Sequence, residues 1–334
     1  MSGLLVGVDG GGSKTAYALC DLSGVILARF EGDTTNYNQV GFDGVTTAVS
    51  EALAALRQTA GLAADASVDG AVLGLGGVGE VSAEMGPLLQ AVKTALGTTP
   101  HRLVNDSEVG WAGALALAPG INIIAGTGSL AFGVNANSET ARAGGWAWAI
   151  GDEGSAHWLA RRILNIFTRQ SDGRLPRTAL YHCLRERLKV TEDVDVRFLP
   201  MQAPRKKVAA LATILPLAEA LGDETPAELY REAAEELALT VRGIRSQISF
   251  DDPVDVSATG GVFRLSPLIR QTFIAALPRY GARYAAPQVA PVEGALLMAA
   301  RDFSPAALES IRYRLLADHP FEPQSIEKVS VNAA

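Results

Sequence analysis

The chain has 334 residues, a formal net charge of −7, 48% hydrophobic residues and 34 glycines. This length allows two domains with cores of their own, and the composition is ordinary for an α/β protein. The negative charge argues against nucleic acid and anionic membranes as partners, and no apolar run approaches the ~20 residues of a membrane helix. The N-terminus lacks a basic region followed by an apolar core, so we expect a cytoplasmic protein.

The first predicted element is a buried strand, Leu4–Val8, which runs into a carboxylate and three glycines. Glycines can adopt positive φ and expose their N–H groups, so the turn can wrap an anion, and a hydroxyl and an ammonium follow as further donors. Such a loop suits a polyphosphate, and Asp9 suits the Mg²⁺ that accompanies it. A tight glycine hairpin without a ligand is the alternative. The candidate phosphate-binding residues are Gly10, Gly11, Gly12, Ser13 and Lys14.

Two better-known phosphate loops do not fit this segment. In a Walker A loop a lysine follows the second glycine directly, and here Ser13 stands at that place. A dinucleotide fingerprint, like the Walker A loop, leads into a helix. Thr15–Asp21, the turn Leu22–Gly24 and Val25–Phe30 instead predict strand, turn and strand.

A polar loop, Gly32–Asn38, comes before a helical pattern from about Phe42 to Leu56. Its amide and hydroxyl groups either face solvent or supply hydrogen bonds to a polyol. Asn36 is the candidate for the second role.

Asp106 lies between a predicted strand and a predicted helix. A strand from Gly70 runs into glycines and a helix covers about Ser82–Leu96. The short strand Arg102–Val104 then leads to Asn105 and Asp106, ahead of a helix that includes Ala112–Leu117. The carboxyl ends of strands are where open α/β sheets bind ligands. Aspartate is equally suited to cap a helix, so the residues alone leave both roles open.

The opening pattern returns near residue 120. Ile121–Ala125 is a predicted strand, Gly126–Ser129 a glycine-hydroxyl turn and Leu130–Val134 a second strand. Gly126–Ala131 fits a dinucleotide pattern only weakly, because a strand follows it. Two strand–loop–strand units indicate a duplicated domain with ATP clamped between the halves.

The segment Gly144–Ser155 is rich in glycine and carries two tryptophans ahead of a helix at about Ala156–Phe167. Asp152 and Glu153 fit capping of that helix, while the glycines and Trp146 also fit a sugar pocket. The following residues are largely helical over 177–188 and 208–248, and we find no chemistry in them. The basic run at 205–207 is interpreted as a solvated helix face.

A third strand, Val254–Ala258, leads into Gly260 and Gly261, where backbone can lie flat against a nucleobase or ribose. A helix is predicted from Pro291 to about Arg301. One amphipathic segment, Pro305–Leu316, follows, and we expect the polar residues after it to be disordered.

In this order and spacing the segments resemble the N-acetylglucosamine kinase branch of the BadF/BadG/BcrA/BcrD ATPase family, which has the actin-like sugar-kinase fold. The likeness covers residues 4–303. It implies an α/β, actin-like ATPase (ribonuclease H-like) fold of two duplicated lobes with a central cleft. The expected lobes are 1–118 with the helix at about 291–303, and 119–290, followed by a tail, 304–334. The matching segments are 9–13, 35–36, 105–106, 126–129, 144–146, 151–155 and 291–295.

The resemblance implies roles for single residues. Asp106 would be the catalytic base that takes the proton from the sugar 6-hydroxyl, with ATP and Mg²⁺ as cofactors and Asp9 on the metal. Phosphates would contact Ser13, Thr127 and Gly128, and the adenosine Gly260 and Gly261. Ala147 stands where a glycine is more usual, and Gly76-Gly77-Val78 replaces a more acidic sequence. The implied sugar contacts are Asn36, Asp106, Gly145, Trp146, Ala147 and Asp152.

We therefore predict an amino-sugar kinase that phosphorylates N-acetylglucosamine at the 6-hydroxyl. A kinase for glucosamine or N-acetylmuramic acid is the first alternative. An ATPase activator would need cysteines for a bridging iron–sulfur cluster, which Cys20 and Cys183 do not provide. A non-catalytic sugar sensor is disfavoured because no DNA-binding segment precedes Val6. The oligomeric state stays open, with a homodimer as one alternative.

Overall fold

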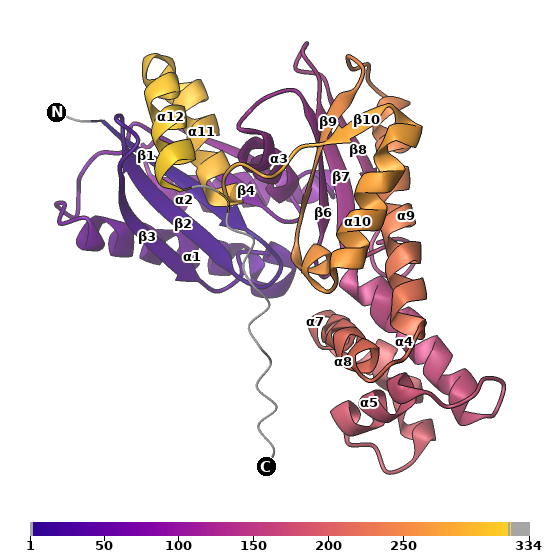
Figure 1. Cartoon of the computed structure of the whole chain (residues 1–334). Helices are drawn as coiled ribbons and strands as arrows, with labels where there is room; N and C mark the ends of the chain where they lie inside the picture. Colours follow the sequence, from indigo (N-terminus) through magenta and orange to yellow (C-terminus); the bar gives the residue numbers. More distant parts are fainter. Residues whose placement is uncertain (1–2, 320, 322–334) are drawn as a thin grey trace. The chain divides into compact units, whose positions relative to one another are not determined.

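The computed structural model of the chain describes residues 3–319 and 321, which form two compact units (Figure 1). The first unit contains the described residues up to Pro119 together with the described residues that follow Ala285. The second unit is Gly120–Ala285.

A five-stranded sheet of order β3-β2-β1-β4-β5 forms the centre of the first unit. β1, β2 and β3 make an antiparallel meander, and β4 and β5 run parallel to β1. The strands are β1 Leu4–Gly10, β2 Thr15–Asp21, β3 Ile26–Gly32, β4 Gly70–Leu75 and β5 His101–Asn105. The helices are α1 Tyr37–Thr59, η1 Ser82–Glu84, α2 Met85–Leu96, α3 Asp106–Leu115, α11 Pro291–Phe303, η6 Pro305–Ala307 and α12 Leu308–Asp318.

Both faces of β1 are covered, which explains its uninterrupted apolar sequence. Leu4, Val6 and Val8 share a core cluster with residues of α1 and α2. Gly7 points the other way: a Cβ on it would lie 2.6 Å from the carbonyl oxygen of Val292 in α11. Glycine at this position therefore lets α11 lie directly on the strand, and this packing fixes the strand that carries Asp9.

The second unit repeats the same topology. Its sheet has the order β10-β9-β6-β7-β8, with β6, β7 and β8 antiparallel and β9 and β10 parallel to the strand on their inner side. Renumbered from the first strand of each unit, the two orders are identical. The predicted α/β fold with two duplicated units is thereby confirmed. The strands are β6 Gly120–Ala125, β7 Ser129–Val134, β8 Thr140–Gly144, β9 Val254–Thr259 and β10 Ala282–Tyr284.

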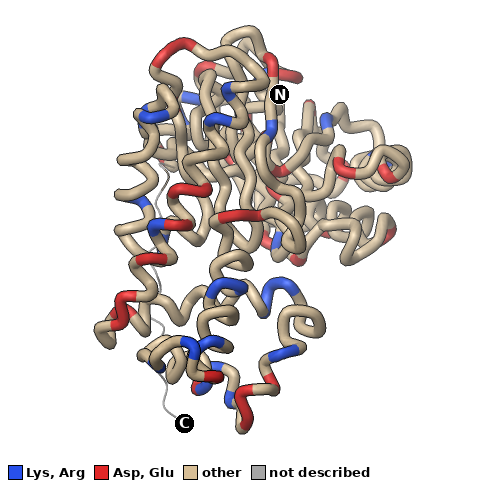
Figure 2. The backbone as a smooth tube through the Cα atoms, turned by 90° about the vertical axis from the view of Figure 1, so that its right-hand side faces the viewer, with Lys and Arg blue, Asp and Glu red and all other residues tan. Residues whose placement is uncertain are grey.

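Helices fill the long connection between β8 and β9, as the amphipathic pattern predicts. They bury a large apolar cluster against the sheet, in which Phe167 and Tyr230 are among the largest fully buried side chains. Acidic and basic residues are interspersed along the backbone (Figure 2). The helices of this unit are α4 Ala156–Ser171, α5 Ala179–Leu188, η2 Asp193–Phe198, α6 Leu199–Gln202, α7 Arg205–Ala209, η3 Ala210–Ile214, α8 Leu215–Ala220, α9 Thr225–Arg245, η4 Gly261–Arg264, α10 Pro267–Ala276 and η5 Leu277–Tyr280.

Some element boundaries differ from the prediction. The first helix begins at Tyr37, because Asn36 caps it, and it is kinked at Gly41, where φ is +71°. The helix expected over Ala112–Leu117 ends at Leu115, since Ala116 and Leu117 adopt left-handed conformations. The edge strands β8 and β10 are short, and neither was predicted.

The C-terminal amphipathic segment forms η6 and α12, and α12 packs on α11 through the buried Ile311 and Leu315. The disorder expected for the polar residues after it concerns positions 320 and 322–334, which lie outside the described residues. Among the described helices, none combines the length and the apolar character that crossing a bilayer requires.

Candidate active site

The loop between β1 and β2 presents unused amide groups. The Gly11 N–H donates to the Lys14 carbonyl at 3.1 Å, which closes the turn. Thr34 Oγ1 and Gln39 Nε2 donate to the carbonyls of Gly11 and Gly12 at 2.8 and 3.0 Å. Over the residues that the structure describes, the N–H groups at 12–14 donate to no protein acceptor. Consecutive free amides of this kind form an anion-binding concavity.

The three glycines of this loop act differently from the expectation. None of them has a positive φ. Gly10 is required by packing, because a Cβ there would lie 2.3 Å from Thr35 Oγ1. A Cβ on Gly11 or Gly12 would meet no atom closer than 3.7 or 3.9 Å, so the fold itself would accept a side chain at both. Because Gly11 and Gly12 have no side chains, the space next to the free amides stays open.

Lys14, the predicted cation of the loop, forms an ion pair with Glu31 at 2.5 Å on the surface of the hairpin. Both side chains are more than half exposed. Such pairs contribute ~0–1 kcal/mol, so the ammonium can leave Glu31 for an anion at little cost.

Asp9 lies in a group of carboxylates at the end of β1. The pKa of the Asp9 carboxyl is raised to about 7: burial is the largest cause, Asp106 and Glu293 also raise it, and Lys14 opposes them. Glu293 lies in the first turn of α11 with its side chain 3% exposed, and Arg29 of β3 pairs with its Oε1 at 2.5 Å. Its buried Oε2 has no hydrogen-bond partner.

These carboxylates fit the Mg²⁺ that the resemblance implies. Two further acids near the buried Asp9 carboxyl favour a bound cation, and Glu293 Oε2, which has no hydrogen-bond partner, is a hard acceptor. Among the described residues, no group of three or more His, Cys, Asp and Glu forms a complete protein cage for a metal. Mg²⁺ is usually held by one or two carboxylates together with water and substrate phosphates, so a cage is not required.

Asp106 and Asn36 converge on Gly76. A Cβ on Gly76 would lie 3.3 Å from Asp106 Oδ2 and 3.6 Å from Asn36 Nδ2. The Gly76 N–H also donates to the Gly10 carbonyl at 2.8 Å, which ties this point to the glycine loop. The absence of a side chain at Gly76 therefore leaves a space that is lined by a carboxylate and an amide.

The capping alternative for Asp106 is wrong. Asn105 is the N-cap of α3: its Oδ1 accepts from the Ser107 N–H at 3.1 Å, and its Nδ2 donates to the Val78 carbonyl at 2.9 Å. Asp106 is the first residue of the helix itself. Asn36 also caps a helix, since its Oδ1 accepts from the Asn38 N–H, while its Nδ2 faces Gly76.

In the second unit, the loop after β6 is tied to the start of α4. The carbonyls of Gly126 and Thr127 accept from the N–H groups of Ala156 and His157 at 2.9 and 3.3 Å. These bonds satisfy donors that a helix start leaves open. The N–H groups of Thr127 and Gly128 have no protein acceptor within the described ranges.

Asp152 is 3% exposed and forms an ion pair with Arg205, the first residue of α7. Burial raises the pKa of the Asp152 carboxyl, and Arg205 opposes this effect. Asp152 does not cap α4, because Ser155 does so through the Trp158 N–H at 3.1 Å. The left-handed backbone of Asp152, with φ +59°, instead turns its carboxylate toward Gly128, where a Cβ would lie 2.8 Å from Oδ2.

The predicted sugar-contacting segment before Asp152 is a left-handed turn. Gly144, Gly145 and Ala147 have φ of +75°, +69° and +69°. The Ala147 carbonyl accepts from the Gly151 N–H at 2.9 Å, and Trp146 stays 74% exposed. Left-handed alanine costs roughly 1–2 kcal/mol, which explains why glycine would suit position 147.

The two glycines after β9 have different surroundings. A Cβ on Gly260, whose φ is +103°, would lie 2.3 Å from the Ala125 carbonyl, so packing alone requires this glycine. Gly261 has only the end of the Arg264 side chain nearby, at 3.6 Å. Only Gly261 therefore leaves open space.

The sequence model of the BadF/BadG/BcrA/BcrD ATPase family matches residues 6–299. The chain belongs to this family. An N-acetylmuramic acid/N-acetylglucosamine kinase of Clostridium acetobutylicum is 27% identical over 260 residues, which are 77% of this chain and 84% of the relative. An N-acetyl-D-glucosamine kinase of Dictyostelium discoideum is 28% identical over 260 residues, with 74% and 81% covered.

Solved structures show the same fold for this BadF/BadG/BcrA/BcrD family member. A candidate N-acetylglucosamine kinase from Chromobacterium violaceum has a TM-score of 0.75 at 28% identity, with 89% of this chain and 99% of that chain covered. A ROK family glucokinase from Streptomyces griseus, solved with glucose and AMPPNP, has a TM-score of 0.54 at 18% identity, with 90% and 100% covered. The second likeness concerns the fold alone.

The structure divides the predicted site residues of this family member between its two units. Asp9, the Gly10–Lys14 loop, Asn36 and Asp106 lie in the first unit, around Gly76 and the end of β1. Two residues were missed: Arg205 was interpreted as surface, and Glu293 had no role beyond its motif. Glu293 could have been found from the sequence as an acid directly before the apolar run 294–300, whereas no sequence signal links Arg205 to Asp152. The second unit holds Thr127, Gly128, Gly145, Trp146, Ala147, Asp152, Gly260 and Gly261.

Proposed function

We propose that this protein is an ATP-dependent kinase that phosphorylates N-acetylglucosamine at the 6-hydroxyl. The named activities of the Clostridium and Dictyostelium relatives support the substrate, and the ATPase family supports the nucleotide. One observation carries the assignment, namely the position of the Asp106 side chain. Asn105 caps α3 in its place, and Asp106 Oδ2 lies next to Gly76 together with Asn36 Nδ2.

In this proposal Asp106 is the general base. Its Oδ2 accepts the proton of the sugar 6-hydroxyl as the oxygen attacks the terminal phosphorus of ATP, and ADP leaves as the bond from that phosphorus to the bridging oxygen breaks. The Asn36 amide donates to a neighbouring sugar hydroxyl and so fixes the direction of attack. A positioned base contributes about 10²–10⁴ in rate, and alignment of the two substrates contributes more.

The glycine loop is proposed to hold the phosphates. The free amides at 12–14 donate to phosphate oxygens, and Lys14 moves from Glu31 to the same anion. Asp9 would hold Mg²⁺, with Glu293 as a nearby acceptor. Bound Mg²⁺ would neutralise charge on the phosphates.

In the second unit we propose the sugar contacts Gly145, Trp146, Ala147 and Asp152. The exposed face of Trp146 suits a pyranose ring, and the apolar turn around Ala147 suits an acetamide methyl. A glucosamine ammonium would need a carboxylate of its own, since a desolvated unpaired charge is costly, and Asp152 is already paired with Arg205. Thr127, Gly128, Gly260 and Gly261 are the proposed nucleotide contacts.

A screen of ATP consumption over amino sugars tests the proposal, with the position of the phosphate determined by NMR. We expect kcat/KM for N-acetylglucosamine to exceed that for glucosamine by about tenfold or more, which requires only ~1.4 kcal/mol of differential transition-state binding. A preference for glucosamine would refute the proposed substrate. ATP consumption that no sugar stimulates would refute the kinase.

A further inference from the structure

A groove in the second unit is lined partly by the end of the predicted sugar-contacting segment and partly by other elements. It encloses about 640 Å³, within the range of small-molecule sites, and its walls come from residues 149–153, α4 and residues 196–200. Gly151 lines it, directly before Asp152. We call this feature the arginine groove.

Three arginines line the arginine groove: Arg161, Arg162 and Arg197. Arg162 is neutralised by Glu232, with contacts of 2.8 and 3.0 Å. Among the described residues, neither Arg161 nor Arg197 forms an ion pair with a carboxylate. Glu153 is the sole acid among the lining residues, so the groove carries a surplus of positive charge.

The two unpaired guanidinium groups are held in place by other contacts. Arg161 Nη1 donates to the carbonyl of Trp148 at 2.9 Å, which joins α4 to the sugar segment. The Arg197 guanidinium lies 4.6 Å from the ring centre of Phe198. Held guanidinium groups with free donors recognise carboxylate and phosphate oxygens well, because their planar fork matches both.

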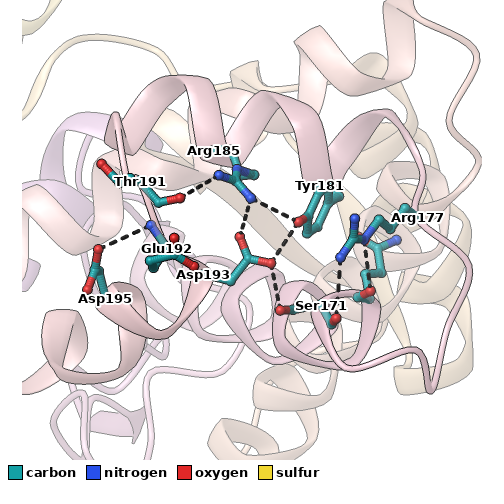
Figure 3. A network of polar contacts seen from close by, with 9 residues as sticks. Ser171, Arg177, Tyr181, Arg185, Thr191, Glu192, Asp193 and Asp195 are labelled. Atoms are coloured by element: carbon teal, nitrogen blue, oxygen red, sulfur yellow. Dashed lines mark hydrogen bonds and ion pairs between the residues drawn. The ribbon is translucent and has the colours of Figure 1, made fainter.

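A polar network fixes the wall that carries Arg197 (Figure 3). Asp193, at the start of η2, accepts from Ser171 Oγ, Tyr181 Oη and Arg185 Nη1 at 2.6, 2.7 and 2.8 Å. Burial alone would raise the pKa of Asp193, but these hydrogen bonds and the Arg185 charge hold it below its usual value. The network therefore ties η2 to α4 and α5 and gives the groove a preformed wall.

The groove also has apolar side chains, together with the polar Asn165 and Thr168. The apolar ones include Ile150, which is 80% exposed, Trp158, Leu164, Val196 and Pro200. Apolar surface next to fixed cations suits a sugar ring that carries one anionic group, and it suits a free inorganic anion less well.

We propose that the arginine groove binds an anionic group carried by an amino sugar, with Arg161 and Arg197 as its partners. This inference rests on the proposed function, because the groove shares Gly151 with the proposed sugar segment. The anion has two sources: the carboxylate of a 3-O-lactyl substituent on a substrate, and the 6-phosphate of the product bound as an inhibitor.

The test compares Arg197→Gln, in η2, with Arg169→Gln, which removes an exposed charge of α4 outside the groove. N-acetylmuramic acid and N-acetylglucosamine 6-phosphate are the probes, measured on the full chain by calorimetry and by kinetics. Arg197→Gln should weaken binding of at least one probe about tenfold, and Arg169→Gln should weaken neither.

The kinetic arms distinguish the two sources. A carboxylate in the groove lowers the ratio of kcat/KM for N-acetylmuramic acid to that for N-acetylglucosamine in Arg197→Gln about tenfold. A product phosphate instead raises the inhibition constant of N-acetylglucosamine 6-phosphate by a similar factor and leaves that ratio unchanged. Arg161→Gln should change the same quantity in the same direction, and it replaces Arg197→Gln as the test variant if Arg197→Gln does not fold.

The experiments distinguish refutation of the anion site in the groove from refutation of the kinase assignment. A wild-type chain that does not phosphorylate N-acetylglucosamine refutes the proposed function, while calorimetry with the two probes still decides the groove. Binding of neither probe to the wild-type chain overturns the inference. Equal affinities in Arg197→Gln, Arg161→Gln and the wild-type chain overturn it as well.

Discussion

At the residue scale, the neighbouring side chains determine the direction and the contacts of a polar group. Asn105 caps α3, so Asp106 can turn its Oδ2 toward the space over Gly76. Asp152 has a different neighbour, since Arg205 forms an ion pair with its buried carboxylate. Two aspartates that look alike in the sequence thus present different chemistry.

We expect Asp106→Asn to lower kcat by about 10² or more with little change in either KM, because an amide cannot accept the proton. The cap on α3 remains, so the variant should still unfold in one cooperative transition. Steady-state kinetics and thermal unfolding measure both quantities. Glu108→Gln, two residues along the same helix, is the matched control and should retain turnover. Near-normal turnover of Asp106→Asn would remove Asp106 from the mechanism.

In the glycine loop, we expect Gly10 to be needed for folding and the adjacent Gly11 to be needed for nucleotide binding. Gly11→Val should fold, because its Cβ meets nothing within 3.7 Å, yet raise the KM for ATP by about tenfold or more. Gly10→Ala should instead lower the free energy of unfolding, since its Cβ would lie 2.3 Å from Thr35 Oγ1. Calorimetry with a nucleotide and denaturant titration separate the two effects. Unchanged nucleotide affinity in Gly11→Val would mean that the loop is only a hairpin.

At the element scale, the first unit depends on a close crossing of α3 and α11. A Cβ on Gly294 would lie 2.3 Å from the Gly113 N and the Val109 carbonyl oxygen. The helix that covers β1 therefore rests on backbone rather than on side chains. Any added methyl group must push α11 away from α3.

We expect Gly294→Ala to lower the free energy of unfolding by about 2–3 kcal/mol, because backbone atoms cannot yield as side chains do. Gly86→Ala in α2 is the matched control: its Cβ meets nothing within 4 Å, so helix propensity should make it neutral or stabilising by up to about 1 kcal/mol. Chemical denaturation of both variants checks the difference. Equal stability of the two would argue against a tight crossing.

The first turn of α4 contains a buried histidine with a consequence for pH. Burial lowers the pKa of His157 to about 4 from a usual value of 6.5, and Arg205 and Arg161 contribute. The folded chain therefore binds this proton more weakly than the unfolded chain does. Stability should be complete above pH 6.5 and fall by up to about 3 kcal/mol as the pH drops toward 4.

His157→Gln tests this, because glutamine does not titrate. Its free energy of unfolding should fall less steeply than that of the wild-type chain between pH 6.5 and 4. Tryptophan fluorescence during denaturation is a suitable probe, since Trp146, Trp148 and Trp158 belong to this unit. Parallel pH profiles would show that His157 is not responsible.

At the scale of the whole molecule, one topology is used twice with different chemistry. Both units place a glycine loop between the first two strands of the same five-stranded order. In the first unit that loop follows Asp9 and lies near two more carboxylates. In the second unit its carbonyls are tied to the start of α4, and no acid precedes it on β6.

The sequence alone determined the features that depend on near neighbours. Apolar strands running into glycines predicted both strand–loop–strand units, and their order with the later motifs indicated the family. The sequence also showed Ala147 at a position where glycine is more usual, and the left-handed φ of this residue explains the preference for glycine. Such features are local, because alternation, turn residues and caps act over a few positions.

Only the tertiary structure decided which distant groups meet. Arg205 reaches Asp152 across 53 positions of sequence, and Glu293 comes to Asp9 because α11 packs on β1. The edge strands β8 and β10 were not predicted because they are short and are defined by pairing with a neighbouring strand. The arginine groove arises in the same way, from a loop and helices that only packing brings together. Burial and charge at a point depend on every element that reaches it, and no stretch of sequence contains that information.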